Sequence, residues 1–288
     1  MRALTNVLRP PRFTRISRAP RTHRMTDSAA IEFDRVTLAR GPRVILREAS
    51  LRVPAGKVTA VIGPSGAGKS TLLHAVTGEL EPSAGRVRVL GFEHPARSTA
   101  ELFRLRRRMG VLLQGNGLLT DLSTFENVAL PLREHTRLPE PVLRELVQMK
   151  LNAVGLAEAG ALMPQELSGG MARRVALARA LVLDPPLMLY DEPLTGLDPI
   201  ACGVILSLIR NLNDSLGLSS FVITHHVAET LAMADHVVVV AEQGIAFAGS
   251  PDALNATRDP LLRQFLNGTP DGPIGFDYRR SGTGAAHG

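Results

Sequence analysis

The 288-residue chain contains a single cysteine, Cys202, so no disulfide can form within it. A lone cysteine is typical of proteins in a reducing compartment. The sequence also lacks any uninterrupted run of about 18 apolar residues, although 44% of its residues are hydrophobic. We therefore expect no segment to span a bilayer alone, and a function at a membrane would require another chain to supply the spanning part.

Acidic residues are absent from residues 1–24, which contain seven arginines. Without these arginines the chain has 26 basic and 27 acidic residues, so the formal net charge of +6 resides in this segment. Because the rest of the chain has nearly equal numbers of basic and acidic residues, its charge argues against a nucleic-acid partner. Residues 1–28 form a basic tail that lacks the apolar core of a secretory signal. Three interpretations stay open: a disordered arm, an organelle transit peptide, or a mis-assigned start with translation beginning at Met25.

From about Ile31 onward, short apolar runs alternate with amphipathic segments. Residues Val58–Ile62 are rich in β-branched side chains and bounded by glycines, which predicts a buried strand. Similar runs predict strands at 87–90, 111–113, 187–190, 221–224 and 237–240. Such runs are typical of a parallel sheet covered by helices on both faces. With helical patterns at 171–183 and 200–216, the sequence predicts an α/β fold.

Residues 115–166 differ, because they show helical patterns and no convincing strand. Prolines interrupt these patterns at Pro131, Pro139, Pro141 and Pro164. We expect a helical subdomain here. The glycine- and proline-rich C-terminal residues predict an extended tail.

Residues 63–70 read GPSGAGKS, which matches the phosphate-loop pattern G-x-x-x-x-G-K-[ST] between a predicted strand and an apolar helical run. Glycines let backbone amides approach phosphates, and the helix N-terminus adds partial positive charge. We expect Lys69 to reach the β- and γ-phosphates and the Ser70 hydroxyl to bind Mg²⁺. The expected phosphate-binding residues are Gly63, Pro64, Ser65, Gly66, Ala67, Gly68, Lys69, Ser70 and Thr71.

The apolar run 187–190 ends in two carboxylates, Asp191 and Glu192. In a protein with a phosphate loop, a strand of this kind places its first carboxylate where it can hold Mg²⁺. The second is then placed to polarise an attacking water. We therefore predict Asp191 as a metal ligand and Glu192 as the catalytic base.

Residues 167–171 read LSGGM and precede an amphipathic helical pattern. Ser168, Gly169 and Gly170 would form a second anion-binding helix N-terminus. One nucleotide does not need two such sites from one chain. The pattern therefore predicts two chains that meet head to tail, each completing the ATP site of the other.

Together these motifs resemble the ATPase subunits of ABC transporters, over roughly residues 31–262. The resemblance implies a P-loop NTPase fold: a nucleotide-binding domain at 29–262 with a helical subdomain at 115–166 and an antiparallel β subdomain. By the same resemblance, Gln114 is similar to the Q-loop glutamine, which contacts Mg²⁺ and faces the membrane partner. Asp198 is similar to the D-loop residue that reaches across the dimer, and His225 to the switch histidine at the γ-phosphate. The implied catalytic set is Glu192, His225, Lys69 and Gln114; the implied metal ligands are Ser70, Gln114 and Asp191.

The sequence departs from the family pattern in two places. An acid usually follows the switch histidine, whereas His226 follows here, and we assign the role to His225. Residues 37–41 lack the aromatic side chain that usually stacks on adenine. Arg40 and Arg43 are either its replacements or solvated surface residues.

A narrower resemblance, to the Mla-type ATPases of phospholipid transporters, is carried by PLREHT at 131–136, LSGGMARR at 167–174 and the segment 263–276. It implies a system that maintains outer-membrane lipid asymmetry in Gram-negative bacteria. The alternative is an ABC transporter for another cargo. Ribosome- or DNA-associated ABC ATPases usually carry two cassettes or a long coiled coil, whereas this chain has one cassette and no heptad array.

The Mla-type resemblance also implies partners and a location. The ATPase would form a homodimer beneath an integral membrane permease, peripheral to the cytoplasmic face of the inner membrane. A lipid-binding protein of the mammalian-cell-entry (MCE) fold and a regulatory subunit of the sulfate-transporter/anti-sigma-antagonist (STAS) fold would complete the complex. The C-terminal extension, residues 263–288, would contact the partner ATPase. The implied cofactors are ATP and Mg²⁺, and no nucleic-acid partner is expected.

Overall fold

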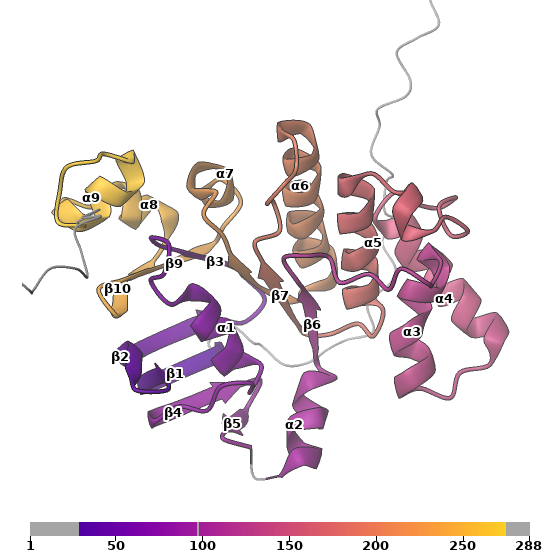
Figure 1. The fold of residues 1–288 in the computed structure, drawn as a ribbon, viewed down its shortest axis with the longest axis horizontal. Helices are drawn as coiled ribbons and strands as arrows, with labels where there is room; N and C mark the ends of the chain where they lie inside the picture. Colours follow the sequence, from indigo (N-terminus) through magenta and orange to yellow (C-terminus); the bar gives the residue numbers. More distant parts are fainter. Residues whose placement is uncertain (1–28, 97, 275–288) are drawn as a thin grey trace, which may run out of the picture.

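The computed structural model describes residues 29–96 and 98–274, which form two β-sheets with helices around them (Figure 1). The antiparallel sheet has the strand order β2-β1-β4-β5. Its strands are β1 (Ala29–Arg40), β2 (Arg43–Pro54), β4 (Ala84–Val89) and β5 (Phe92–His94). The basic tail predicted at 1–28 and residues 275–288 of the predicted extension lie outside the described residues.

The larger sheet has the strand order β10-β9-β3-β8-β7-β6. Its strands are β3 (Val58–Ile62), β6 (Met109–Leu112), β7 (Leu187–Asp191), β8 (Ser219–Ile223), β9 (His236–Ala241) and β10 (Gly244–Gly249). All neighbouring pairs are parallel except β9 and β10, which are antiparallel. The carboxyl ends of the five parallel strands therefore share one edge, where α/β folds place their ligands.

Both faces of this sheet are buried, which explains the uniformly apolar strands. Successive side chains of a strand point to opposite faces. Leu187 and Leu189 of β7 pack with α1 (Lys69–Val76) and the antiparallel sheet, so α1 lies between the two sheets (Figure 1). Met188 and Tyr190 pack on the opposite face. That face is covered by α5 (Gly169–Leu181) and α6 (Pro199–Leu216).

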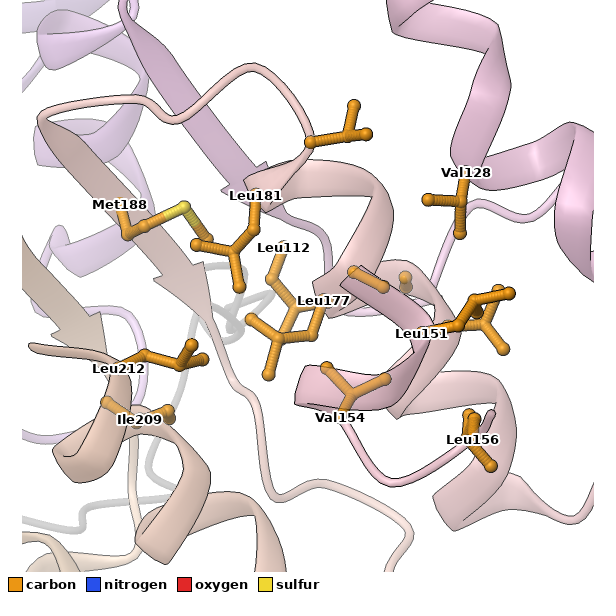
Figure 2. Close-up of a cluster of buried hydrophobic side chains, with 14 of the residues drawn as sticks. Leu112, Val128, Leu151, Val154, Leu156, Leu177, Leu181, Met188, Ile209 and Leu212 are labelled. Atoms are coloured by element: carbon orange, nitrogen blue, oxygen red, sulfur yellow. The ribbon is translucent and has the colours of Figure 1, made fainter. Parts of the chain in front are cut away.

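Residues 115–166, which were predicted as a helical subdomain, form α3 (Thr124–His135), α4 (Glu140–Ala153) and a short 3₁₀ turn at Pro164–Glu166. Buried side chains of α3 and α4, among them Val128 and Leu151, belong to the same core cluster as Leu177 of α5 (Figure 2). This subdomain and the parallel sheet therefore share one core, and α5 belongs to both.

The structure corrects the predictions for Pro131 and for residues 87–90. Pro131 does not interrupt its helix but lies inside α3, where buried Val128, Ala129 and Leu132 hold the helix against its neighbours. A proline removes one helical hydrogen bond, and this packing offsets the loss. The predicted strand 87–90 exists as β4, but it belongs to the antiparallel sheet, where it pairs with β1 and β5.

The remaining helices are α2 (Thr99–Arg106), α7 (Val227–Leu231), α8 (Pro251–Asn255) and α9 (Pro260–Asn267). The boundary predicted between residues 262 and 263 falls inside α9, because Leu261, Leu262 and the partly buried Phe265 pack on the same cluster under β9. Gln264 of α9 holds the segment up to Ile274 against the domain, because its side chain bonds both the N–H and the carbonyl of Ile274. Across the described ranges, no helix combines the length and apolarity needed to cross a bilayer.

Candidate active site

The predicted phosphate loop connects β3 to α1 at the shared carboxyl edge of the parallel sheet. Gly63 has a φ of 151°, and a Cβ on it would lie 2.1 Å from the carbonyl oxygen of Val240. Gly68, at the start of α1, has a φ of 107° and faces Ile45 of β2. No side chain caps the first turn of α1. The loop therefore requires glycine at both ends and leaves its helix amides for a ligand.

Lys69 bridges the two ends of this loop. Its ammonium donates to the carbonyl oxygens of Gly63 at 2.7 Å and Pro64 at 3.0 Å. Burial lowers the pKa of Lys69, and the negative charges of Glu192 and Asp191 oppose that effect. The lysine and the two predicted acidic residues are thus close enough to influence one another.

The two acids lie where β7 ends. Burial raises the pKa of the Asp191 carboxyl and the charge of Glu192 raises it further, while His74 and Lys69 act in the opposite direction. Glu192 has left the strand with a φ of 49°, and its N–H donates to the carbonyl of Ile223 on β8. This left-handed backbone turns the Glu192 side chain away from the direction that the strand would give it.

His225 follows β8 and lies directly against Glu192. Its ring Nδ1 is 2.8 Å from Glu192 Oε2, and its backbone N–H donates to the same oxygen at 3.3 Å. The side chain of His225 is 57% exposed, whereas that of Glu192 is only 15% exposed. His226 lies beside it, with ring centroids 4.4 Å apart, and begins the turn into α7. Of the two histidines, His225 is therefore the one that contacts Glu192, the predicted base.

Gln114 lies beyond the end of β6 with an exposed side chain. The predicted strand 111–113 starts two residues late and ends one residue late compared with β6, because Leu113 leaves the sheet and is 49% exposed. The carbonyls of Leu113 and Gln114 are instead held by the guanidinium of Arg173 on α5.

The other predicted residues form a separate groove of about 420 Å³. Ser168, Gly169, Gly170 and Asp198 all line it, and no residue of the phosphate loop does. Ser168 Oγ caps α5 by accepting from the N–H of Met171, and Asp198 caps α6 through two backbone amides. One chain therefore carries two separate sets of candidate nucleotide-binding residues.

The sequence prediction missed the side chains of His74 and Arg173 in this region, and the backbone contact made by Thr195. His74 lies one turn after Ser70 on α1, acts on the Asp191 carboxyl and bonds Glu79 through Nδ1 at 2.7 Å. Arg173 is spaced four and eight residues before the buried Leu177 and Leu181, which places it on the buried face of α5. That spacing was the available signal for Arg173. Thr195 contributes a backbone carbonyl, which carries no signal in sequence.

Comparison with known proteins places these features in a family. The model of the family described as ABC transporter matches residues 46–195. The intermembrane phospholipid transport system ATP-binding protein MlaF of Haemophilus influenzae is 51% identical over 248 residues, covering 86% of this chain and 94% of the relative. Its namesake from Escherichia coli K12 is 51% identical over 243 residues, covering 84% and 90%. The dimeric, post-hydrolysis structure of the ATP-binding cassette MJ0796 with ADP and Pi superimposes with a TM-score of 0.70 at 28% identity, covering 77% of this chain and 98% of that one.

Proposed function

This chain belongs to the ABC transporter family, and from that premise we propose that it is the ATP-hydrolysing subunit of an intermembrane phospholipid transport system. The observation that carries the ATPase function is the convergence of Lys69, Asp191 and Glu192 at one edge of the parallel sheet. The sequence identity of 51% with two phospholipid transport ATPases supports phospholipid as the cargo.

ATP binds first through the phosphate loop, residues 63–71. The backbone amides at the start of α1 and the Lys69 ammonium meet the negative phosphates. Lys69 already donates to two carbonyls at the mouth of this loop, so its charge is held in place before a nucleotide arrives. Arg40 and Arg43 flank the exposed turn between β1 and β2, the strand whose Ile45 faces Gly68. Either arginine can stack on the adenine ring through its guanidinium plane.

The donors proposed for Mg²⁺ fit that ion. Ser70, Gln114 and Asp191 offer a hydroxyl, an amide and a carboxylate oxygen, and Mg²⁺ prefers oxygen ligands. Within the described residues no cluster of three or more His, Cys, Asp or Glu side chains could hold a metal. A single carboxylate next to a phosphate loop is the arrangement that Mg²⁺ adopts with nucleotide substrates. When bound, Mg²⁺ neutralises charge on the phosphates.

Hydrolysis requires a water positioned opposite the leaving ADP. Glu192 accepts a proton from that water as the oxygen–phosphorus bond forms and the bond to ADP breaks. His225 holds Glu192 through Oε2, which orients the carboxylate and assigns the second oxygen, Oε1, to the water. Gln114 contributes its amide from the loop after β6, and Lys69 stabilises the charge that develops on the phosphoryl oxygens.

The groove at Ser168–Gly170 and Asp198 completes the site of a second copy. Two chains facing head to tail bring the phosphate loop of one to this groove of the other, with ATP between them. The dimeric cassette to which this chain is similar supports the arrangement. Hydrolysis removes the bridging phosphate, and the dimer then opens.

The helical subdomain passes this motion to a permease. A groove of about 670 Å³ lies where α2, β6, α3 and α5 meet, with Leu130, Pro131 and Leu183 among its apolar lining and Phe103 exposed at its side. Arg179 also lines it and donates to the carbonyls of Asn116 and Gly117 in the loop of Gln114, so a permease segment seated here would sense that loop. The subunit then acts peripherally at the cytoplasmic face of the inner membrane, with MCE-fold and STAS-fold proteins in the same complex.

The C-terminal extension is proposed to contact the partner ATPase. Its first part, residues 263–274, packs on its own chain through α9 and the Gln264–Ile274 hydrogen bonds. Pro273 and Ile274 lie in one hollow with Ser65 and Gly66 of the phosphate loop. Ile274 therefore lies on the side of the molecule that would face the second copy.

The function is tested by purifying the protein from its native membrane in mild detergent, followed by mass spectrometry of proteins and lipids. Recovery of a permease, an MCE-fold protein and bound phospholipid is expected. A permease with a different binding protein and no lipid would leave the ATPase function standing and reject the cargo. Ribosomal or DNA-bound partners without a permease would reject the transport function.

A further inference from the structure

Arg173 is a buried residue whose side chain connects several elements of the site region. It lies in the second turn of α5, the helix that begins at the Ser168–Gly170 groove, and is 3% exposed. Its Nη1 donates to the carbonyls of Leu113 and Gln114, both at 3.0 Å, and its Nη2 donates to the carbonyl of Thr195 at 3.1 Å. One guanidinium therefore joins three segments: α5, the loop after β6 and the loop after β7.

The second of these loops leads directly to the proposed base. The N–H of Thr195 donates to the carbonyl of Glu192 at 3.3 Å, so Thr195 closes the turn that Glu192 begins. Glu192 holds a left-handed backbone there, which costs free energy unless its neighbours enforce it. The carbonyl of Thr195 that Arg173 binds thus belongs to the turn that orients Glu192.

The first loop is attached to α5 at both ends. Arg179, about two helical turns after Arg173, donates to the carbonyls of Asn116 at 2.9 Å and Gly117 at 2.7 Å. Asn116 and Gly117 both have left-handed backbone conformations, with φ near 60°. Arg173 holds the beginning of the loop and Arg179 its end, so the loop that carries Gln114 must move with α5.

The burial of Arg173 is costly for folding. All its hydrogen-bond partners are backbone carbonyls, and within the described residues no carboxylate pairs with it. Its Nε is buried and has no hydrogen-bond partner in the part of the chain that the structure describes. Burial lowers the pKa of the guanidinium, which reflects the cost of removing its charge from water. An apolar residue in line with Leu177 and Leu181 would fill this position at lower cost, so stability alone does not account for an arginine.

We propose that Arg173 is a positioning residue that links the Ser168–Gly170 groove to Gln114 and Glu192, so that engagement of the groove by a nucleotide on the second copy sets both catalytic loops. The inference rests on the proposed function, because it assumes that ATP is hydrolysed between two chains. Arg173 does not touch the phosphate loop in this arrangement. Its loss should therefore slow turnover while nucleotide binding by the same chain stays unchanged.

The test compares Arg173→Met with Arg210→Met in the full-length protein purified together with its membrane partners. Arg210 is a matched control, because it also donates to a loop carbonyl, that of Met233, and pairs with Asp235 far from the proposed base. We expect Arg173→Met to lower kcat at least tenfold, with the Kd for a fluorescent ATP analogue changed less than twofold. Arg210→Met is expected to lower Tm and leave kcat within twofold of the unchanged protein.

Two results would overturn the inference. One is an unchanged kcat in Arg173→Met. The other is a parallel loss of Tm and nucleotide affinity with kcat per bound nucleotide preserved, which is the behaviour of a purely structural residue. If Arg173→Met does not fold, Arg173→Gln must show the same fall in kcat with an unchanged Kd for the nucleotide. The glutamine amide is too short to bridge both loops. Lys69→Ala in the same preparation separates the two claims. If Lys69→Ala is inactive and Arg173→Met fully active, only the role of Arg173 fails; if Lys69→Ala hydrolyses ATP normally, the proposed site itself fails.

Discussion

Glu192 Oε2 meets one residue, His225, in two ways: it lies 2.8 Å from the ring Nδ1 and accepts a hydrogen bond from the backbone N–H at 3.3 Å. The two residues come from the ends of neighbouring strands, β7 and β8, and their contact fixes the rotamer of a carboxylate that is only 15% exposed. The carboxylate is therefore oriented by the sheet itself, before any ligand binds.

Substitution of this pair is expected to separate binding from chemistry. Glu192→Gln keeps the size of the side chain and removes the base, so turnover should fall by a factor of about 10² to 10⁴. ATP affinity should stay unchanged, because the phosphate loop is intact. Single-turnover hydrolysis with radiolabelled ATP measures the first effect and equilibrium binding the second. Rapid turnover by Glu192→Gln would exclude Glu192 as the base.

His225→Ala should reduce turnover by a comparable factor, because Glu192 then loses its contact with the ring Nδ1 and keeps only the longer hydrogen bond from the backbone N–H. The neighbouring substitution His226→Ala is the control, since the His226 ring has no contact with Glu192 among the described interactions. Steady-state ATPase rates of the two variants decide the assignment. A larger loss in His226→Ala than in His225→Ala would transfer the switch role to His226.

Lys69→Ala should abolish both hydrolysis and transport. The change removes the charge that meets the phosphates and the two hydrogen bonds that join Gly63 and Pro64 across the loop mouth. Lys57→Ala is the matched control, because Lys57 is exposed and lies at the opposite end of β3. Hydrolysis that survives in Lys69→Ala at the level of the control would contradict the role of the loop.

Asp191 is expected to lower the stability of the folded protein at pH 7 although it is needed for function. Its pKa is raised mainly by burial, so the folded state binds a proton more tightly than the unfolded state. Such a group favours folding below its unfolded pKa, and that contribution is lost as the pH rises through the folded pKa. At pH 7 Asp191→Asn should therefore raise the Tm of the nucleotide-free protein while it abolishes Mg²⁺-dependent hydrolysis. The difference in Tm should shrink as the pH is lowered towards 4; a difference independent of pH would contradict this origin.

Leu151→Ala tests the core shared by the helical subdomain and the sheet (Figure 2). Leu151 of α4 is fully buried, and its truncation should lower the free energy of unfolding by about 2–5 kcal/mol. Met149→Ala, on the same helix but 53% exposed, should change it by less than about 0.5 kcal/mol. Urea denaturation followed by circular dichroism measures both. Equal values for the two variants would mean that α4 unfolds independently of the core.

The sequence predicted the parallel strands and the phosphate loop well, because strands buried on both faces are uniformly apolar and the loop has a fixed pattern. It did not predict β1 and β2, although each has twelve residues. Four register shifts interrupt their pairing, and Arg35 and Glu48 have left-handed backbones. The alternation that marks an exposed strand is lost at such bulges.

Within the site, side-chain motifs were predictable and backbone contacts were not. Lys69, Asp191, Glu192 and His225 were predicted from their motifs, and the structure places them close to one another. Arg173 was not identified, because its three acceptors are carbonyls that any residue could provide. The signal that was overlooked is a charged residue on the buried face of a helix.

The central claim is that two chains form each ATP site, one through its phosphate loop and the other through its groove at Ser168–Gly170. Light scattering on size-exclusion fractions of Glu192→Gln, with and without ATP, tests it most directly. The account predicts a doubling of mass with ATP, which is lost when Ser168→Arg blocks the second groove although ATP still binds the phosphate loop. Glu192→Gln that binds ATP and remains a monomer, or a dimer that Ser168→Arg leaves intact, would contradict it.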